Sequence, residues 1–221
     1  MKVVIAAATK MEWQLIHDTI DPKSLVENNH IEIEFFTTGI GVMATTYALI
    51  NFIFKSKPDL IIQVGIAGSY TKDLQLAEVV LVDEDCQGDL VVEENGQLLD
   101  LFDLNLNDEN MVPFLNKKLP NPWLKDFVIS LKKVPAITIS EVTTSANRSI
   151  QLQQKYNGKI ETMEGAALHY VCLQNQVPFI QVKAISNYVG ERNKSNWVIK
   201  DALSNLSSAV VEILLSLKIN S

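Results

Sequence analysis

Ile160-Glu161-Thr162-Met163-Glu164-Gly165-Ala166-Ala167 is the stretch of the chain that decides the fold. It begins with a β-favouring residue, and the small residues that end it let a helix backbone pack close to a sheet. The stretch therefore predicts a strand that runs directly into a helix beginning near Met163. Ligands of open α/β sheets bind outside the carboxyl ends of the strands, where Glu164 is expected to lie. Taken alone, Glu164 is better explained as an acid stabilised by the dipole of a helix N-terminus.

Strand and helix patterns alternate on both sides of this stretch. The remaining predicted strands cover residues 3–8, 31–36, 60–64, 78–82, 134–139 and 178–185. The remaining predicted helices cover residues 11–20, 42–54, 150–156 and 201–217. Strands that alternate with helices are typical of a three-layer α/β fold. The chain has no internal repeat, low-complexity segment or linker, so a single domain over residues 1–221 is expected.

Turn signals separate these elements. Two glycine pairs, Gly39/Gly41 and Gly65/Gly68, follow predicted strands and predict turns that a ligand could approach closely. Asp21-Pro22 predicts the end of the first helix, and Gly158 the end of the helix over residues 150–156. The acidic segment 83–122 predicts a long insertion with at most one short hairpin, near residues 90–99.

Composition excludes several classes of protein. The net charge of -7 argues against nucleic acid and anionic membranes as partners. The apolar runs are too short to span a bilayer, and the first of them predicts a strand rather than a signal peptide. Cys86 and Cys172 lie far apart without metal-ligand spacing, which favours two reduced thiols in a cytoplasmic protein. No cofactor or metal is expected.

Three polar residues follow predicted strands directly: Glu12, Glu164 and Asn187. Strand ends of this kind meet at one edge of a sheet, so these side chains are expected to converge on one site. Neither glycine pair matches GxGxxG or the phosphate-binding loop, so nucleotide-phosphate binding has little support.

The motifs around these residues resemble those of the nucleoside phosphorylase/nucleosidase superfamily, over nearly the whole chain. They are Met1 to Ile5 with Glu12, Gly39-Ile40-Gly41, Val64-Gly65-Ile66-Ala67-Gly68, Glu161 to Ala167, and Lys183-Ala184-Ile185-Ser186-Asn187. The resemblance implies a three-layer αβα fold around a central twisted mixed sheet, a small-molecule nucleoside as substrate, and a homodimer or higher homo-oligomer. Lys183 stands where the superfamily usually has arginine.

The resemblance also implies roles for single residues. Glu12 would position and deprotonate the water that captures a ribosyl cation. Glu164 would accept hydrogen bonds from the ribose 2′- and 3′-hydroxyls, and Met163 would pack on the sugar, although core filling explains Met163 nearly as well. The other substrate-binding residues implied are Gly65, Ile66, Thr144, Arg192 and Trp197.

Asn187 is the residue that distinguishes the possible substrates. Members that cleave adenine nucleosides carry Asp at this position, whereas the Asn amide offers two donors and never ionises. Those donors match N7 and the 6-oxo group of a 6-oxopurine, and Asn187 would stabilise the departing base. A nucleosidase for 6-aminopurine nucleosides is the first alternative, and an Asn that merely caps a loop is the second.

The positions of the arginines indicate which nucleophile is used and which residues could bind the part of the substrate beyond the ribose. Phosphorolysis needs a cationic phosphate site, but no arginine precedes Arg148, so water is the expected nucleophile. Arg192 and Trp197 could bind a carboxylated aromatic group beyond the ribose, although exposed loop cations are usually solvated. A non-catalytic nucleoside-binding protein is the alternative from another class, and the joint presence of Glu12 and Glu164 argues against it.

Overall fold

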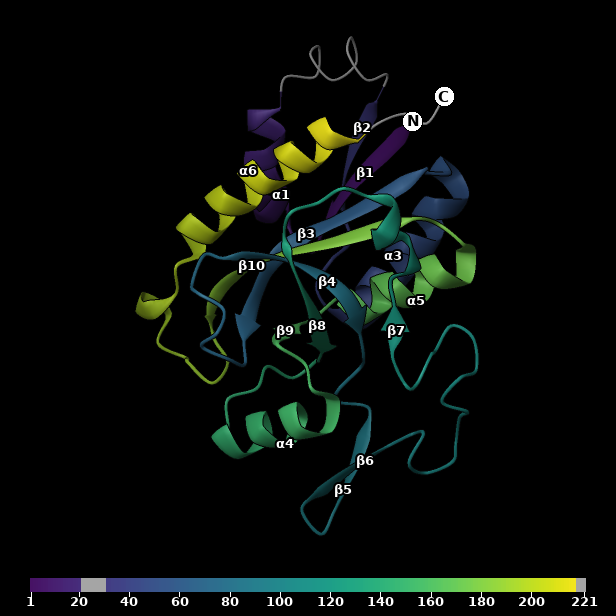
Figure 1. Ribbon diagram of the computed structural model, residues 1–221, viewed down its shortest axis with the longest axis vertical. Helices are drawn as coiled ribbons and strands as arrows, with labels where there is room; N and C mark the ends of the chain where they lie inside the picture. Colours follow the sequence, from purple (N-terminus) through teal and green to yellow (C-terminus); the bar gives the residue numbers. More distant parts are fainter. Residues whose placement is uncertain (21–30, 218–221) are drawn as a thin grey trace.

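The computed structural model describes residues 1–20 and 31–217, and eight strands in these ranges form one mixed sheet (Figure 1). They are β1 (Lys2–Ala7), β2 (Glu32–Thr37), β3 (Leu60–Ser69), β4 (Val79–Asp85), β7 (Leu119–Pro120), β8 (Lys132–Thr138), β9 (Ile160–Thr162) and β10 (Phe179–Tyr188). The strand order β10-β4-β8-β9-β3-β1-β2 is joined by a further pairing of β10 with β3. This pairing closes part of the sheet into a barrel, and β1 and β2 extend from it.

Helices cover both faces of the sheet. They are α1 (Lys10–Thr19), α3 (Gly41–Ser56), α4 (Ala146–Tyr156), α5 (Gly165–Asn175) and α6 (Ile199–Ser216), with short 3-10 helices η1 (Pro122–Asp126) and η2 (Lys194–Asn196). Helices α1 and α6 pack together on one side, and α3 and α5 on the other (Figure 1). Val3 and Ile5 of β1 face the first pair, whereas Val4 and Ala6 face the second. The predicted α/β class with a central mixed sheet is confirmed.

The prediction of a turn at Gly65/Gly68 is wrong, because β3 continues through both glycines to Ser69. The glycines are needed for space rather than for a turn. A Cβ atom on Gly65 would lie 2.7 Å from Oε1 of Glu12 and 2.9 Å from Nζ of Lys183. Gly39 and Gly41 do form the predicted turn, with left-handed φ angles of +83° and +86°.

Several element boundaries differ from the prediction. Strand β10 extends past Ile185 to Tyr188 and carries a bulge between Ile185 and Asn187, so Asn187 lies in a strand. Helix α4 begins at Ala146, where the Ser145 side chain accepts a hydrogen bond from a backbone N–H of the first turn. It ends at Asn157 in the left-handed conformation, rather than at Gly158.

The acidic segment contains the predicted hairpin, formed by β5 (Val91–Glu94) and β6 (Gln97–Asp100). The predicted helix end at Asp21-Pro22 lies outside the described residues. No helix in the described part of the chain is long and apolar enough to cross a membrane. Likewise, no cluster of three or more His, Cys, Asp or Glu there is arranged to hold a metal ion.

Candidate active site

A cavity of about 250 Å³ opens where β1 ends and where β3, β9 and β10 run side by side. Its polar lining residues are Thr9, Glu12, Glu161, Thr162, Glu164, Ser186 and Asn187. The apolar ones include Ile66, Met163 and Trp197. The structure thus brings Glu12, Glu164 and Asn187 into one cavity.

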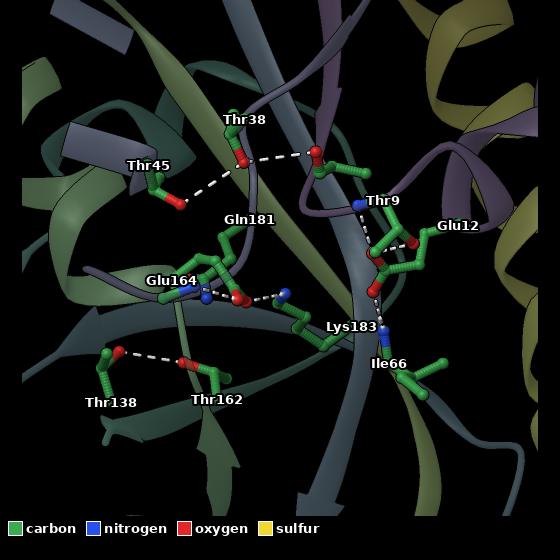
Figure 2. Close-up of polar contacts among 12 residues, drawn as sticks. Thr9, Glu12, Thr38, Thr45, Ile66, Thr138, Thr162, Glu164, Gln181 and Lys183 are labelled. Carbon is green, nitrogen blue, oxygen red and sulfur yellow. Dashed lines mark hydrogen bonds and ion pairs between the residues drawn. The ribbon is translucent and has the colours of Figure 1, made fainter. Parts of the chain in front are cut away.

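Glu12 is fixed by the start of helix α1. The backbone N–H and the hydroxyl of Thr9 both donate to Oε2 of Glu12, each at 3.0 Å, which closes a capping box (Figure 2). The backbone N–H of Ile66 lies 3.3 Å from the other oxygen, Oε1. The side chain is buried, yet it lines the cavity, so its carboxylate faces the cavity in a fixed orientation.

Glu164 is the N-cap residue of α5, one position before the helix begins. Its Oε1 accepts a hydrogen bond of 3.0 Å from the backbone N–H of Gly41, the first residue of α3. Its Oε2 lies 3.9 Å from Nζ of Lys183 (Figure 2). The carboxylate therefore joins two helix N-termini, where a negative charge is stabilised by both dipoles.

Lys183 brings a positive charge close to these carboxylates. Its side chain is only 2% exposed, and its ammonium group lies over Gly65 beside Oε1 of Glu12. A buried carboxylate is costly without a compensating cation, and Lys183 provides one for Glu164, which it approaches to 3.9 Å. Gly65 itself does not line the cavity, but its missing side chain leaves space that Oε1 of Glu12 and Nζ of Lys183 both border.

Asn187 has a defined amide orientation. Its Nδ2 donates to the backbone carbonyl of Tyr188 at 3.0 Å, and its Oδ1 accepts from the Ser186 hydroxyl at 2.7 Å. The Nδ2 atom carries a second N–H, which these contacts leave for a ligand.

Besides Gly65, two further residues predicted to bind substrate, Thr144 and Arg192, do not line this cavity. Thr144 is exposed and lines a neighbouring cavity of about 610 Å³ together with Arg148, and Val142 borders both cavities. Arg192 is exposed, and its guanidinium lies 5.9 Å from the centre of the Trp197 ring. Trp197 lines the cavity, and its indole N–H donates to the Glu191 carbonyl at 3.1 Å.

Glu161 is a cavity residue that sequence reasoning did not select. Its side chain is buried; Tyr70 donates its hydroxyl to Oε2 at 2.6 Å, and the backbone N–H of Thr143 donates to Oε1 at 3.1 Å. Burial, followed by the charge of Glu161, raises the pKa of Tyr70 far above its usual range, so Tyr70 remains a donor. A carboxylate inside a predicted strand, between Ile160 and Thr162, was the signal that the sequence offered.

A buried polar network lies behind Glu164 and holds the start of α5. The Ala166 backbone N–H donates to the Thr138 hydroxyl at 2.8 Å, and that hydroxyl donates to Oδ1 of Asp85 at 2.8 Å. The Thr138 and Thr162 hydroxyls are 2.9 Å apart (Figure 2). The Thr138 side chain therefore links Asp85 to the start of helix α5, next to Glu164.

His169 and Gln181 complete this network. Burial lowers the pKa of His169 to about 4, so the imidazole is neutral near pH 7. Its Nδ1 lies 2.7 Å from the Leu119 carbonyl and must carry the proton, which leaves Nε2, 2.8 Å from the Gln181 amide, as an acceptor. The amide NH₂ of Gln181 therefore belongs toward His169, with its carbonyl toward Asp85. A protonated Asp85 can donate to that carbonyl.

The pKa of Asp85 predicts how stability depends on pH. Burial raises it to about 7 from an ordinary value of 3.8. Between these values the folded protein keeps a proton that the unfolded chain releases, so the free energy of unfolding falls as pH rises, by roughly 4 kcal/mol in all. Asp85→Asn cannot ionise, so we expect its free energy of unfolding to rise relative to wild type between pH 4 and pH 8.

Urea denaturation of both proteins across this range measures the difference. His169 has a lowered pKa and works in the opposite direction between about pH 4 and pH 6.5, but it is present in both proteins and cancels. A difference that stays constant with pH would show that Asp85 is ionised in the folded protein throughout.

The comparison with known families fits this site. Residues 35–217 match the family described as the phosphorylase superfamily, so the chain belongs to that superfamily. The protein is an enzyme of the nucleosidase type, an N-glycosidase that cleaves the bond between a base and its sugar.

Similar proteins come from two groups of nucleosidases. Futalosine hydrolase from Thermus thermophilus is 30% identical over 183 residues, which cover 81% of this chain and 80% of the relative. The 5′-methylthioadenosine/S-adenosylhomocysteine nucleosidase from Maridesulfovibrio salexigens is 25% identical and covers 98% of each chain. A crystal structure of the corresponding Helicobacter pylori nucleosidase aligns with a TM-score of 0.79 at 18% identity, covering 98% of this chain and 99% of that one. At this identity the structural likeness shows the fold.

Proposed function

We propose that this enzyme hydrolyses the N-glycosidic bond of a 6-oxopurine nucleoside. The substrate we propose is futalosine, cleaved to hypoxanthine and dehypoxanthine futalosine in the futalosine pathway of menaquinone biosynthesis. The observation that carries this proposal is Asn187, an amide donor of fixed orientation in the same cavity as Glu12 and Glu164. The 30% identity to a futalosine hydrolase supports it.

Base recognition follows from the hydrogen bonds of Asn187. Because Nδ2 keeps one N–H free and is the Asn187 atom nearest to the cavity residue Gly68, the amide presents N–H to the cavity. N7 and O6 of hypoxanthine are both acceptors, whereas adenine presents a donating 6-amino group beside N7. A buried donor that faces another donor has no hydrogen-bond partner. Such a mismatch discriminates strongly against adenine in favour of hypoxanthine.

The carboxylates fit the chemistry of the sugar. Loss of the base leaves an oxocarbenium-like ribosyl cation, which the negative charges of Glu12 and Glu164 stabilise. Glu164 accepts hydrogen bonds from the ribose 2′- and 3′-hydroxyls, with Met163 packed on the sugar. Glu12 takes a proton from the attacking water, and its fixed position beside the cavity suits a general base. The water oxygen bonds to the anomeric carbon as the bond to the base breaks, and Asn187 stabilises the departing hypoxanthine anion.

Water rather than phosphate is the nucleophile in this proposal. None of the described residues that line the cavity is Lys or Arg, and a phosphate subsite needs such cations. Lys183 does not line the cavity, and its ammonium group lies 3.9 Å from Oε2 of Glu164, so its charge is already paired with a carboxylate.

The far end of futalosine carries a carboxylated aromatic group. Trp197 lines the cavity with Arg192 stacked beyond it, so we propose that Trp197 packs on this ring and Arg192 pairs with the carboxylate.

We further propose that the enzyme is a homodimer or a higher homo-oligomer. Helix α3 exposes a row of large apolar side chains, among them Met43 (87% exposed), Tyr47 (74%) and Phe54 (71%). Ile40, one residue before this helix, lines the cavity and is 61% exposed. Burial of this face against a second copy would stabilise an oligomer and cover one side of the cavity.

A 6-aminopurine nucleosidase is the second candidate. Methylthioadenosine, adenosylhomocysteine or aminodeoxyfutalosine would be its substrate, and the identity of 25% across 98% of the chain to a nucleosidase for the first two favours it. Asn187 argues against it, because its fixed amide presents a donor to the 6-amino group.

Base release from purified enzyme separates these candidates. We expect kcat/KM for hypoxanthine release from futalosine to exceed that for adenine release from methylthioadenosine by roughly 10²-fold or more. Chromatography of the released bases, with and without phosphate, gives the measurement. Faster release of adenine would contradict the 6-oxopurine assignment, a ribose 1-phosphate product would identify a phosphorylase, and binding without turnover would identify a nucleoside-binding protein.

A further inference from the structure

Glu161 and Asn187 lie on either side of one glycine. Across β9, β3 and β10, Glu161 is in register with Gly68, and Gly68 with Asn187. A Cβ atom on Gly68 would lie 3.4 Å from Nδ2 of Asn187 and 3.9 Å from Cβ of Glu161, so all three residues face the same side of the sheet. All three also line the cavity, and we call them the Glu161–Gly68–Asn187 row.

The space between the two outer residues of the row is wide enough to hold one edge of a purine ring. Neighbouring strands lie about 4.8 Å apart, which puts the backbones of β9 and β10 roughly 10 Å apart across the glycine. Because Gly68 has no side chain, a flat ligand can lie between the carboxylate on one side and the amide on the other. The row then offers an acceptor and a donor to the same edge of the ligand.

The Glu161 carboxylate has more accepting capacity and more charge than its protein contacts use. Each of its oxygens accepts one hydrogen bond, from Thr143 or Tyr70, and a carboxylate oxygen can accept two. Among the described residues, no Lys, Arg or His nitrogen lies within 4.0 Å of it. A buried carboxylate without a cation is costly, and a neutral acceptor would be enough to hold Tyr70.

We propose that Glu161 determines base specificity by accepting the N1–H of a 6-oxopurine while Asn187 donates its remaining N–H to O6 of the same edge. In hypoxanthine the N1–H donor stands next to the O6 acceptor, so one edge matches the row. In adenine N1 carries a lone pair that would face the carboxylate, and a 6-amino group would face the amide donor of Asn187. Both contacts are then repulsive. The inference rests on the proposed function and adds Glu161 to Asn187 as a second residue that recognises the base.

Glu161→Gln tests this role, with Tyr70→Phe as the matched control. The Gln side chain keeps the size of Glu161 but loses the charge and replaces one accepting oxygen with a donor. We expect kcat/KM for futalosine to fall roughly 10- to 100-fold, while kcat/KM for its 6-amino counterpart stays level or rises. Tyr70→Phe removes the hydroxyl that Glu161 holds but leaves the carboxylate, so the ratio of the two substrates should not change.

An equal loss on both substrates in Glu161→Gln would overturn the proposal, because it would identify a structural role. A shifted ratio in Tyr70→Phe would overturn it as well. Calorimetry on wild-type protein gives a second test that needs no variant: hypoxanthine should bind at least about tenfold more tightly than 1-methylhypoxanthine, which lacks the N1–H. Equal binding of the two bases would also refute the role of Glu161. Failure of the proposed function is recognised separately, since wild-type enzyme would then release adenine faster than hypoxanthine.

Discussion

Replacing Glu12 with glutamine is expected to reduce kcat roughly 10²- to 10⁴-fold while nucleoside binding is retained. The amide keeps the size of the side chain, and its oxygen can still accept the hydrogen bonds from Thr9 that close the capping box. It cannot take a proton from water, and it removes one negative charge beside the ribosyl cation. Because neither loss affects the ground state of the substrate, the effect should fall on kcat rather than on KM.

Steady-state kinetics with futalosine and calorimetry with hypoxanthine measure the two quantities separately. Glu32→Gln is the matched control, since Glu32 is an exposed carboxylate at the start of β2. It makes the same chemical change away from the cavity and should leave both quantities unaltered. Full activity in the Glu12 variant would assign the general base to another residue.

Asn187→Asp is expected to move base preference toward 6-aminopurine nucleosides by roughly 10²-fold or more in the ratio of kcat/KM values. The oxygen that replaces Nδ2 would lie near the Tyr188 carbonyl, which Nδ2 now contacts at 3.0 Å. Two acceptors at that distance repel, so the new carboxyl should hold a proton, which turns from the Tyr188 carbonyl to N7 when a base binds. A protonated carboxyl offers one donor and one acceptor, the pattern that N7 and a 6-amino group require.

Competition between futalosine and its 6-amino counterpart in one reaction reports the ratio directly, independent of how much active enzyme each preparation contains. Ser186→Ala serves as the companion variant, because it removes the hydroxyl that orients the amide but leaves the amide itself. It should lower the rate on both substrates with a smaller change in their ratio. An unaltered preference in Asn187→Asp would show that the base is read elsewhere in the cavity.

The alternation of strand and helix segments, together with the positions of the motifs, predicted most of the fold. A strand that is buried on both faces is easy to recognise, because it is a continuous apolar run in the sequence. Val3 to Ala6 show this, since alternate residues enter two different hydrophobic cores. The closure of the sheet by β10 and β3 leaves no such mark, because a strand paired on both sides has the same composition in an open and in a closed sheet.

The site was predicted less evenly. Glu12, Glu164 and Asn187 share one cavity as expected, since each follows or ends a strand of the same sheet. The turn predicted at Gly65 was wrong because a sequence does not distinguish a glycine needed for a turn from one needed for space. Glu161 was missed because two hydrogen bonds from distant segments hold it. Thr144 lines the neighbouring cavity because the loop before α4 turns that way, and its role in substrate binding stays a prediction.

The register of three strands has a consequence for how this enzyme could change during evolution. The Glu161–Gly68–Asn187 row lies across the sheet, whereas Glu12 and Glu164, for which we propose the hydrolytic roles, lie at the starts of helices α1 and α5. If the row reads the base as we propose, substitutions within it alter which base is accepted while Glu12 and Glu164 keep their positions. A descendant lineage could acquire a new nucleoside through one or two codon changes, without first losing the ability to cleave the glycosidic bond.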